Sequence, residues 1–404
     1  MRHQLTVAAL GLLLAWGGAR AQDTGAGTAP SGTVPSGAQE QIDDLREIVT
    51  EPEGAIQTTV SDVKTLKKIK FSGYVQARYE NHEGGAGPGS GTRNNFTVRR
   101  ARLKAAASPV AHAGVTLQAD FSGTSPSLKD AFVDWFPLAA EADQSWVLSA
   151  GQMKWPFGYQ VVQSSSVRET PERALVIQRL FPGERDRGVM VTSPAARPIW
   201  LQAGVFNGAG SNANDDNNSK DVVGRARWSP LASLDLGASF YVGRRLAVAP
   251  AAAVDPTPVF NDANGNGVMD AGEQVGIVAG KPAVAAREEN KTRYGSDIQW
   301  WPFTGLSLKA EYVTGKEFVG GRNVTAKGWY ALGTYSLTPG LDIVTMYDTY
   351  DDTSAGNSRD IWHFGFTRHL TDATRARVFY QIVNEPIGPS RDNNVVMAEL
   401  ISLF

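Results

Sequence analysis

The sequence contains no cysteine, which excludes a disulfide framework, a cysteine-ligated zinc site and a cysteine nucleophile. It also has little net charge: the formal value is −2 at pH 7, so no strong overall field indicates a nucleic-acid partner. Metalloprotease, serine-hydrolase and phosphate-loop motifs are absent as well. These absences favour a protein that is not an enzyme, and they leave the hydrophobic pattern as the main source of information.

Long apolar runs are also missing. Beyond the N-terminus, no run reaches the 18 residues that a membrane helix needs. At the N-terminus, Arg2 precedes the apolar run Leu5–Trp16 and the small-residue site Ala19–Ala21, which predicts a secretory signal peptide over residues 1–21. A membrane anchor is the alternative, but twelve apolar residues are too few to cross a bilayer.

The composition changes twice after the signal peptide. Residues 22–40 are rich in glycine, alanine, proline, serine and threonine, and they predict a disordered linker. Residues 41–68 carry apolar side chains at helical spacing and predict a periplasmic helical segment. Its two short apolar stripes are consistent with an oligomeric coiled coil and equally with a single amphipathic helix.

From residue 69 to residue 404 the pattern alternates with a period of two, which is typical of β-strands. Short turns alternate with long polar loops, as in outer-membrane barrels, and aromatic residues gather near the strand ends. We therefore predict an all-β fold, a sixteen-stranded antiparallel transmembrane β-barrel over 69–404 with a short N-terminal helical segment. The predicted strands are 69–80, 95–106, 112–121, 129–136, 145–153, 187–193, 199–206, 221–229, 233–243, 291–301, 305–314, 325–337, 341–350, 359–369, 373–382 and 393–404.

The connection 154–186 is long and densely charged. A connection of about thirty residues inside a compact fold is often functional. In a barrel wide enough to leave a lumen, one long loop can fold inward and narrow it. We predict that this connection forms the constriction of an outer-membrane pore.

Charged residues on membrane strands must face the lumen or lie at a rim. A column of cations there attracts anions and binds phosphate-like groups through paired donors. The alternatives are anchoring at the membrane interface and pairing with lumen acids such as Asp120, Asp130, Asp134, Asp297 and Glu311. Arg99 has the opposite parity from Arg100, so we expect it at a rim or a local irregularity. The basic lumen residues are Arg99, Arg100, Arg102, Lys104, Arg225, Arg227, Arg375 and Arg377, with Arg78, Arg293 and Lys309 as further candidates.

The segments FTVRRARLKA, LKDAFVDW, GQMKWPFGYQ, RETPER and FPGERDRGV resemble the phosphate-selective porin O and P family of Gram-negative outer membranes. The likeness covers most of 69–404 and is strongest over 96–190. It implies a sixteen-stranded homotrimeric porin with an arginine ladder and a basic constriction, in contact with outer-membrane lipid and with small anions such as phosphate. The resemblance places Arg99 and Arg100 at that constriction, with Lys154, Arg168 and Arg173 as additional candidates.

The connection 244–290 contains a second motif, because Asp262–Glu273 matches the twelve-residue calcium loop. Its flanks are not a helix pair, so we expect an isolated external loop that binds Ca²⁺; a flexible Asn/Gly loop is the alternative. The expected oxygen ligands are Asp262, Asn264, Asn266, the Val268 carbonyl, Asp270 and Glu273.

Together these patterns predict an outer-membrane porin for passive diffusion of small hydrophilic solutes, with a preference for anions and with phosphate as a candidate solute. A general or organic-solute porin with a salt-bridged lumen is one alternative. A surface-interaction barrel that works through its calcium loop is another. A hydrolase that uses His363 or His369 with a nearby serine is the third, and no nucleic acid is expected as a partner.

Overall fold

The computed structural model describes most of the predicted barrel. Residues 1–68 and the predicted calcium loop Asp262–Glu273 lie outside the described residues. The chain divides into the units Met1–Lys64 and Thr65–Phe404, and the fold below is that of the second unit. The described residues are 69–84, 93–138, 142–195, 198–248, 253, 257–260, 274–279, 281–283, 287–319, 322–353, 358–387 and 393–404.

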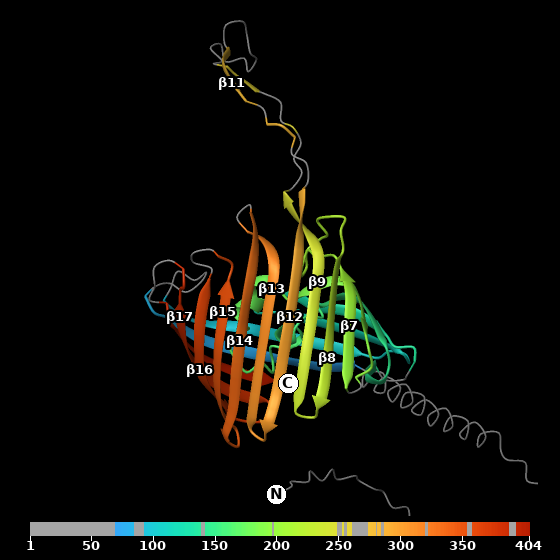
Figure 1. Ribbon diagram of the computed structural model, residues 1–404, viewed down its shortest axis with the longest axis vertical. Helices are drawn as coiled ribbons and strands as arrows, with labels where there is room; N and C mark the ends of the chain where they lie inside the picture. The colour runs from blue at the N-terminus through green and yellow to red at the C-terminus, as the bar shows by residue number, and fades with distance from the viewer. Residues whose placement is uncertain are drawn as a thin grey trace, which may run out of the picture. The chain divides into compact units, whose positions relative to one another are not determined.

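The predicted fold class is confirmed, because sixteen antiparallel strands close into one barrel. Figure 1 shows the strands of one wall running obliquely side by side. Among the described helices, none has the length and apolar character to cross a membrane. In ring order the strands are β1 (Ile69–His82), β18 (Val395–Leu403), β17 (Thr374–Asn384), β16 (Arg359–His369), β15 (Leu341–Asp351), β14 (Arg322–Thr338), β13 (Leu306–Val319), β12 (Arg287–Phe303), β9 (Leu234–Val248), β8 (Asp221–Leu231), β7 (Ile199–Phe206), β6 (Arg185–Thr192), β5 (Val147–Lys154), β4 (Ser127–Trp135), β3 (Ala113–Asp120) and β2 (Asn94–Ala107).

The two faces of each strand differ as a membrane barrel requires. On β18, the side chains of Val396 and Leu400 are exposed on the outer face, whereas Met397, Glu399 and Ile401 are buried on the inner face. An apolar outer face suits lipid, and inward polar groups suit a lumen. The exposed aromatic side chains include the tryptophans at positions 135, 146, 228, 300, 329 and 362.

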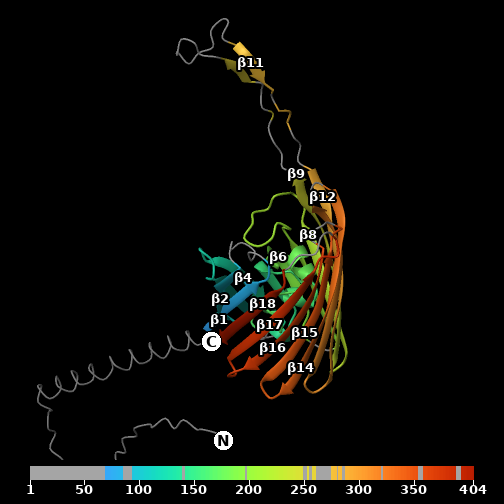
Figure 2. The same cartoon turned by 90° about the vertical axis from the view of Figure 1, so that its left-hand side faces the viewer.

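The barrel closes between its first and last strands. β1 pairs antiparallel with β18, and Figure 2 shows these strands beside each other. The closure ends in two backbone hydrogen bonds between Gly73 and Phe404, with N–O distances of 2.9 and 3.0 Å. Phe404, which follows β18 directly, is thus held against β1 by its backbone.

The long connection 244–290 differs from its prediction. β9 and β12 extend into it and pair Arg244 with Asn290 and Arg245 with Glu289. A separate two-stranded sheet forms from β10 (Thr257–Phe260) and β11 (Gln274–Val278). The apolar alternation ends near residue 243, but strand pairing continues because a strand that leaves the membrane can carry polar residues on both faces.

Candidate functional site

The connection between β5 and β6, residues 155–184, crosses the inside of the barrel, and we call it the inward segment. It contains the helices α2 (Tyr159–Val162) and α3 (Leu175–Leu180). The backbone N–H of Gly158 donates to Ser239 Oγ on β9 over 2.9 Å, and Arg78 on β1 donates to Glu172 over 2.6 Å. β1 and β9 lie eight places apart in either direction around the ring. The segment therefore spans the lumen from wall to wall, as its length and charge predict.

An apolar contact holds one side of the inward segment against the wall. Trp155, Phe157 and Phe181 of the segment are buried and pack together, with Phe157–Phe181 centroids 4.4 Å apart. The ring of Tyr241 on β9 lies 6.0 Å from Trp155 and 6.2 Å from Phe181. Each such buried aromatic side chain contributes about 1.5–3 kcal/mol relative to exposure in water. The segment is thus packed into the lumen rather than suspended in it.

The start of α2 requires a glycine. Gly158 has φ of 54°, which favours glycine, and a Cβ there would lie 1.8 Å from Glu311 Oε1 on β13. This close approach lets the Gln160 N–H donate to Glu311 Oε2 over 3.1 Å. The carboxylate therefore fixes the base of the inward segment to the wall.

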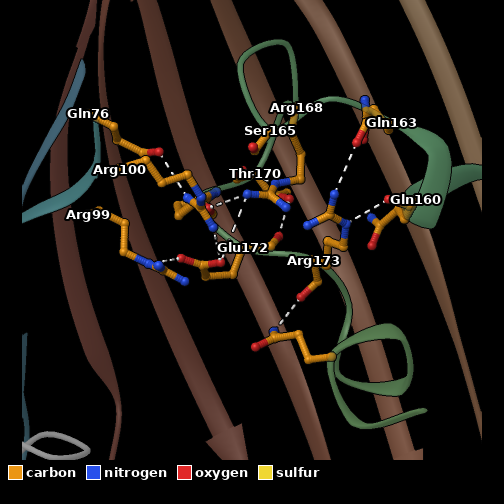
Figure 3. Close-up of polar contacts among 12 residues, drawn as sticks. Gln76, Arg99, Arg100, Gln160, Gln163, Ser165, Arg168, Thr170, Glu172 and Arg173 are labelled. Atoms are coloured by element: carbon orange, nitrogen blue, oxygen red, sulfur yellow. Dashed lines mark hydrogen bonds and ion pairs between the residues drawn. The ribbon is translucent and has the colours of Figure 1, made fainter. Parts of the chain in front are cut away.

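Glu172 lies at the centre of a guanidinium cluster. Arg78 and Arg99 donate to Oε1 over 2.6 Å each, and Arg100 donates to Oε2 over 2.8 Å. A fourth guanidinium, from Arg168, lies 3.9 Å from Oε2. Figure 3 shows the side chains of Arg99, Arg100 and Arg168 pointing toward this carboxylate. We call these four arginines and Glu172 the Glu172 clamp.

A β-bulge explains how two successive arginines reach one carboxylate. On β2, Arg100 pairs with Gln76 and Val98 pairs with Ala77, so Arg99 has no partner in the register. An extra residue re-aims the side chains of the bulged strand. The predicted irregularity at Arg99 is confirmed, and both arginines face the inward segment.

Neighbouring cations strongly favour the ionised forms of Glu172 and of Glu184, a second carboxylate of the inward segment. Burial would raise the pKa of Glu172, but Arg100, Arg99 and Arg168 hold it well below its usual range. Burial opposes ionisation of Glu184 too, yet Arg173, Lys154 and Arg185 lower its pKa to about 2. Glu172 and Glu184 are therefore both charged at neutral pH.

Most of the predicted basic ladder is paired with acids. Arg102 donates to Asp120 over 2.8 Å, and Arg225 donates to Asp297 over 2.8 Å. Glu399 on β18 accepts from Arg78 over 2.6 Å and also from Arg377. Three ladder residues have no ion pair within the described residues: Arg375 donates to the Ser166 carbonyl, Arg227 lies over the Trp200 ring at 5.0 Å, and Lys104 is half-buried.

The three additional candidates hold the inward segment together. Lys154 donates to the carbonyls of Val162 and Gln163, at 3.1 and 2.6 Å. Arg168 is 1% exposed and donates to the Thr170 and Pro171 carbonyls. Arg173 pairs with Glu184. Their buried side chains shape the constriction from within and do not line an open path.

Two acids of the site were not among the predicted pathway residues. Glu172 stood out only as one of several charges in its connection, because nothing local indicates which arginines it meets. Glu399 had a usable signal: it has inward parity on the last strand, and closure places it opposite Arg78 and Arg377.

The model of the family described as "Phosphate-selective porin O and P" matches residues 69–349. The chain belongs to this family. No curated protein sequence matches this porin. The sequence resemblance over the constriction segments is therefore confirmed at the level of the family.

Solved structures similar to this porin are outer-membrane barrels. The trimer form of OmpT from Vibrio cholerae is 9% identical with a TM-score of 0.57, and the match covers 83% of this chain and 99% of that one. An anion-selective porin from Comamonas acidovorans is 10% identical with a TM-score of 0.54, covering 83% and 99%. Salmonella typhi OmpF in complex with daunomycin is 12% identical with a TM-score of 0.55, covering 83% and 97%. These identities show the fold alone, and with the family they indicate an outer-membrane porin.

Proposed function

We propose that this porin lets small hydrophilic solutes diffuse through a lumen whose charges are balanced internally, so that it prefers anions only weakly. The observation that carries this proposal is the Glu172 clamp, in which the loop's own carboxylate occupies the basic constriction. The alternative of a salt-bridged lumen is thereby favoured over an open arginine ladder.

The physical reason is that paired charges act weakly at a distance. A guanidinium paired one-to-one with a carboxylate within 3 Å presents little net charge to an ion several ångströms away. The Glu172 clamp has four guanidiniums for one carboxylate, so Glu172 lowers its positive charge without cancelling it, and salt screens the remainder. The lumen-side cations without an acid partner among the described residues, such as Arg375 and Arg227, supply the modest preference for anions.

Selectivity for phosphate is the second candidate function. It is supported by the convergence of Arg78, Arg99 and Arg100, since guanidinium pairs bind phosphate oxygens well. For phosphate to bind there, it must first displace the Glu172 carboxylate. The two candidates therefore differ in whether phosphate competes with chloride.

A planar-bilayer recording of the purified protein separates these functions. Stable conductance in KCl that millimolar phosphate leaves unchanged supports weak selectivity. Block of the chloride current by phosphate supports the second candidate. Absence of any conductance overturns both and favours the surface-interaction barrel.

Several features complete the proposal. A homotrimer is supported by the family and by the trimer form of the V. cholerae neighbour. Contact with outer-membrane lipid is supported by the apolar outer face. The signal peptide over 1–21, the helical segment over 41–68 and the calcium site at Asp262–Glu273 stay predictions.

A further inference from the structure

We propose that the lumen on the long-loop side of the inward segment binds short peptides with apolar side chains. This rests on the proposed diffusion function and names a class of solute for it. A cavity of about 810 Å³ lies there, lined by β1, β2, β15–β18 and α3. Its lining combines an apolar wall with charges of both signs, and this combination identifies the ligand class.

The apolar wall is unusual for a porin lumen, which is ordinarily polar. Ile361, Val383, Val395 and Met397 all face inward, are less than a tenth exposed and line the cavity. Ile361 lies directly opposite Val383 across β16 and β17. Apolar residues that line a hydrated space provide a surface for an apolar solute.

The cavity carries nearly balanced charge. Three arginines, at positions 78, 99 and 359, and four carboxylates, at positions 80, 83, 172 and 348, line it. Arg78 and Arg99 are engaged by Glu172, and Asp348 accepts the Leu175 N–H with both oxygens, at 3.0 and 2.9 Å. These contacts leave Arg359 and the carboxylates Glu80 and Glu83 as the charges best placed for a ligand.

The unpaired cation lies at one end of the apolar wall. Arg359 lies on β16 two residues from Ile361, on the same inward face. Among the described residues it forms no ion pair, and its Nε is buried without a hydrogen-bond partner. A buried N–H donor without a partner is costly, and a ligand carboxylate would satisfy the Nε–H of this half-buried side chain.

The carboxylates lie at the other end. Glu80 on β1 is directly opposite Met397 on β18, so an acid adjoins the apolar wall. The Arg78 guanidinium lies 3.8 Å from Glu80 and the His82 imidazole 3.9 Å, both longer than a hydrogen bond. A ligand ammonium group would find an acceptor here.

The spacing of these groups selects a peptide over a single amino acid. β1 and β16 are three places apart in the ring, or roughly 14 Å across the strands. An extended peptide advances about 3.3–3.6 Å per residue, so three to five residues cover this gap once the side chains of Glu80 and Arg359 reach inward. A free amino acid cannot reach both ends.

The proposal is tested by measuring how tri-leucine blocks the KCl current. Tri-glycine is the matched probe, because it has the same charged termini and no apolar side chains. Tri-leucine should halve the current at a concentration about tenfold lower than tri-glycine, since its side chains bury apolar area. N-acetyl-tri-leucine and tri-leucine amide each lose one terminal charge, and free leucine is too short. All three should block less well than tri-leucine.

Variants assign the block to this cavity. In the double variant Met397→Gln, Val395→Thr, the concentration of tri-leucine that halves the current should come within about twofold of that of tri-glycine. The control is Val324→Thr, on the inner face of β14 outside this lining, and it should leave both concentrations unchanged. Arg359→Gln should weaken block by tri-leucine and leave block by its amide unchanged.

The proposal is overturned if tri-leucine blocks no better than tri-glycine, or no better than its own amide. It is also overturned if the double variant Met397→Gln, Val395→Thr still prefers tri-leucine over tri-glycine as wild type does. These outcomes require a conducting channel. Absence of conductance would instead contradict the proposed diffusion function, so the two failures are distinguishable.

Discussion

At the residue scale, one carboxylate contacts four arginines of the inward segment and its wall. Glu172 is provided by the inward segment, and three of its four arginine partners come from the β1–β2 wall. Removing one partner of a buried ion pair typically costs about 3–5 kcal/mol, because the remaining charge stays buried and uncompensated. The clamp therefore fastens the segment to the wall and lowers the positive charge of the arginine cluster.

The clamp should respond to acid only well below the usual range of a glutamate. A carboxyl group with a lowered folded pKa stabilises the fold above its ordinary pKa, and loses this contribution as pH falls through the folded value. For Glu184, which lies outside the clamp and pairs with Arg173, these limits are 4.5 and about 2. The clamp's contribution, measured as the difference in conductance between wild type and Glu172→Gln, should be constant from pH 7 to about pH 4.5 and change only at lower pH. A bilayer titration in which this difference changes with a midpoint near pH 5 would contradict the ion pairing.

The sequence predicted which residues face the lumen better than it predicted their ion-pair partners. The run FTVRRARLKA predicted inward cations, and the parity of Arg99 indicated the bulge. The role of Glu172 could not be predicted, because the inward segment meets β1 and β2 only after the barrel closes. Lys154, Arg168 and Arg173 were read as pathway residues, yet a loop that crosses a lumen buries its own cations against its carbonyls.

At the element scale, the inward segment has two kinds of attachment. Its apolar side packs through Phe157 and Phe181 against Tyr241, and its charged side meets the arginines of β1 and β2. The apolar attachment does not depend on salt or pH, whereas the ionic one does. The segment should thus stay anchored on one side when the clamp opens.

Truncating the apolar anchor should loosen the segment and leave the barrel intact. Phe181→Ala removes a side chain that is 1% exposed, at a cost of about 3–5 kcal/mol. Single-channel recordings should show larger and noisier currents, while the barrel still shifts on heating in detergent electrophoresis. Phe96→Ala, at a position 82% exposed on the outer face, is the matched control and should behave as wild type. Identical currents in both variants would refute the anchor.

At the scale of the whole molecule, the sequence predicted the barrel well because the membrane imposes its pattern on every strand. The sixteen strands were predicted with ends that differ by a few residues, since lipid demands apolar residues at alternate positions. The predicted ends of β9 and β12 fall several residues short, because the two strands stay paired beyond the point where the apolar alternation stops. Closure of the barrel depends on Gly73 of β1, against which the Phe404 ring packs.

Substituting Gly73 should impair closure. A Cβ there would lie 2.4 Å from the Arg102 carbonyl oxygen and 2.4 Å from the Phe404 ring. Gly73→Val should therefore lower the yield of heat-modifiable barrel on refolding into detergent. The matched control is Gly333→Val on β14, where the nearest atom would be 3.7 Å away and the yield should stay near wild type. Equal yields from the two variants would show that the fit at Gly73 is unimportant.

The most direct test of the internally balanced lumen is the reversal potential across a tenfold KCl gradient, measured for wild type and Glu172→Gln. We expect a small potential for wild type and a shift toward the chloride limit of about 59 mV in the variant, because the arginine cluster loses its counter-ion. Glu288→Gln, which removes a carboxylate paired with Arg244 outside the clamp, should not shift it. A wild-type potential already near that limit, unchanged by Glu172→Gln, would contradict the account.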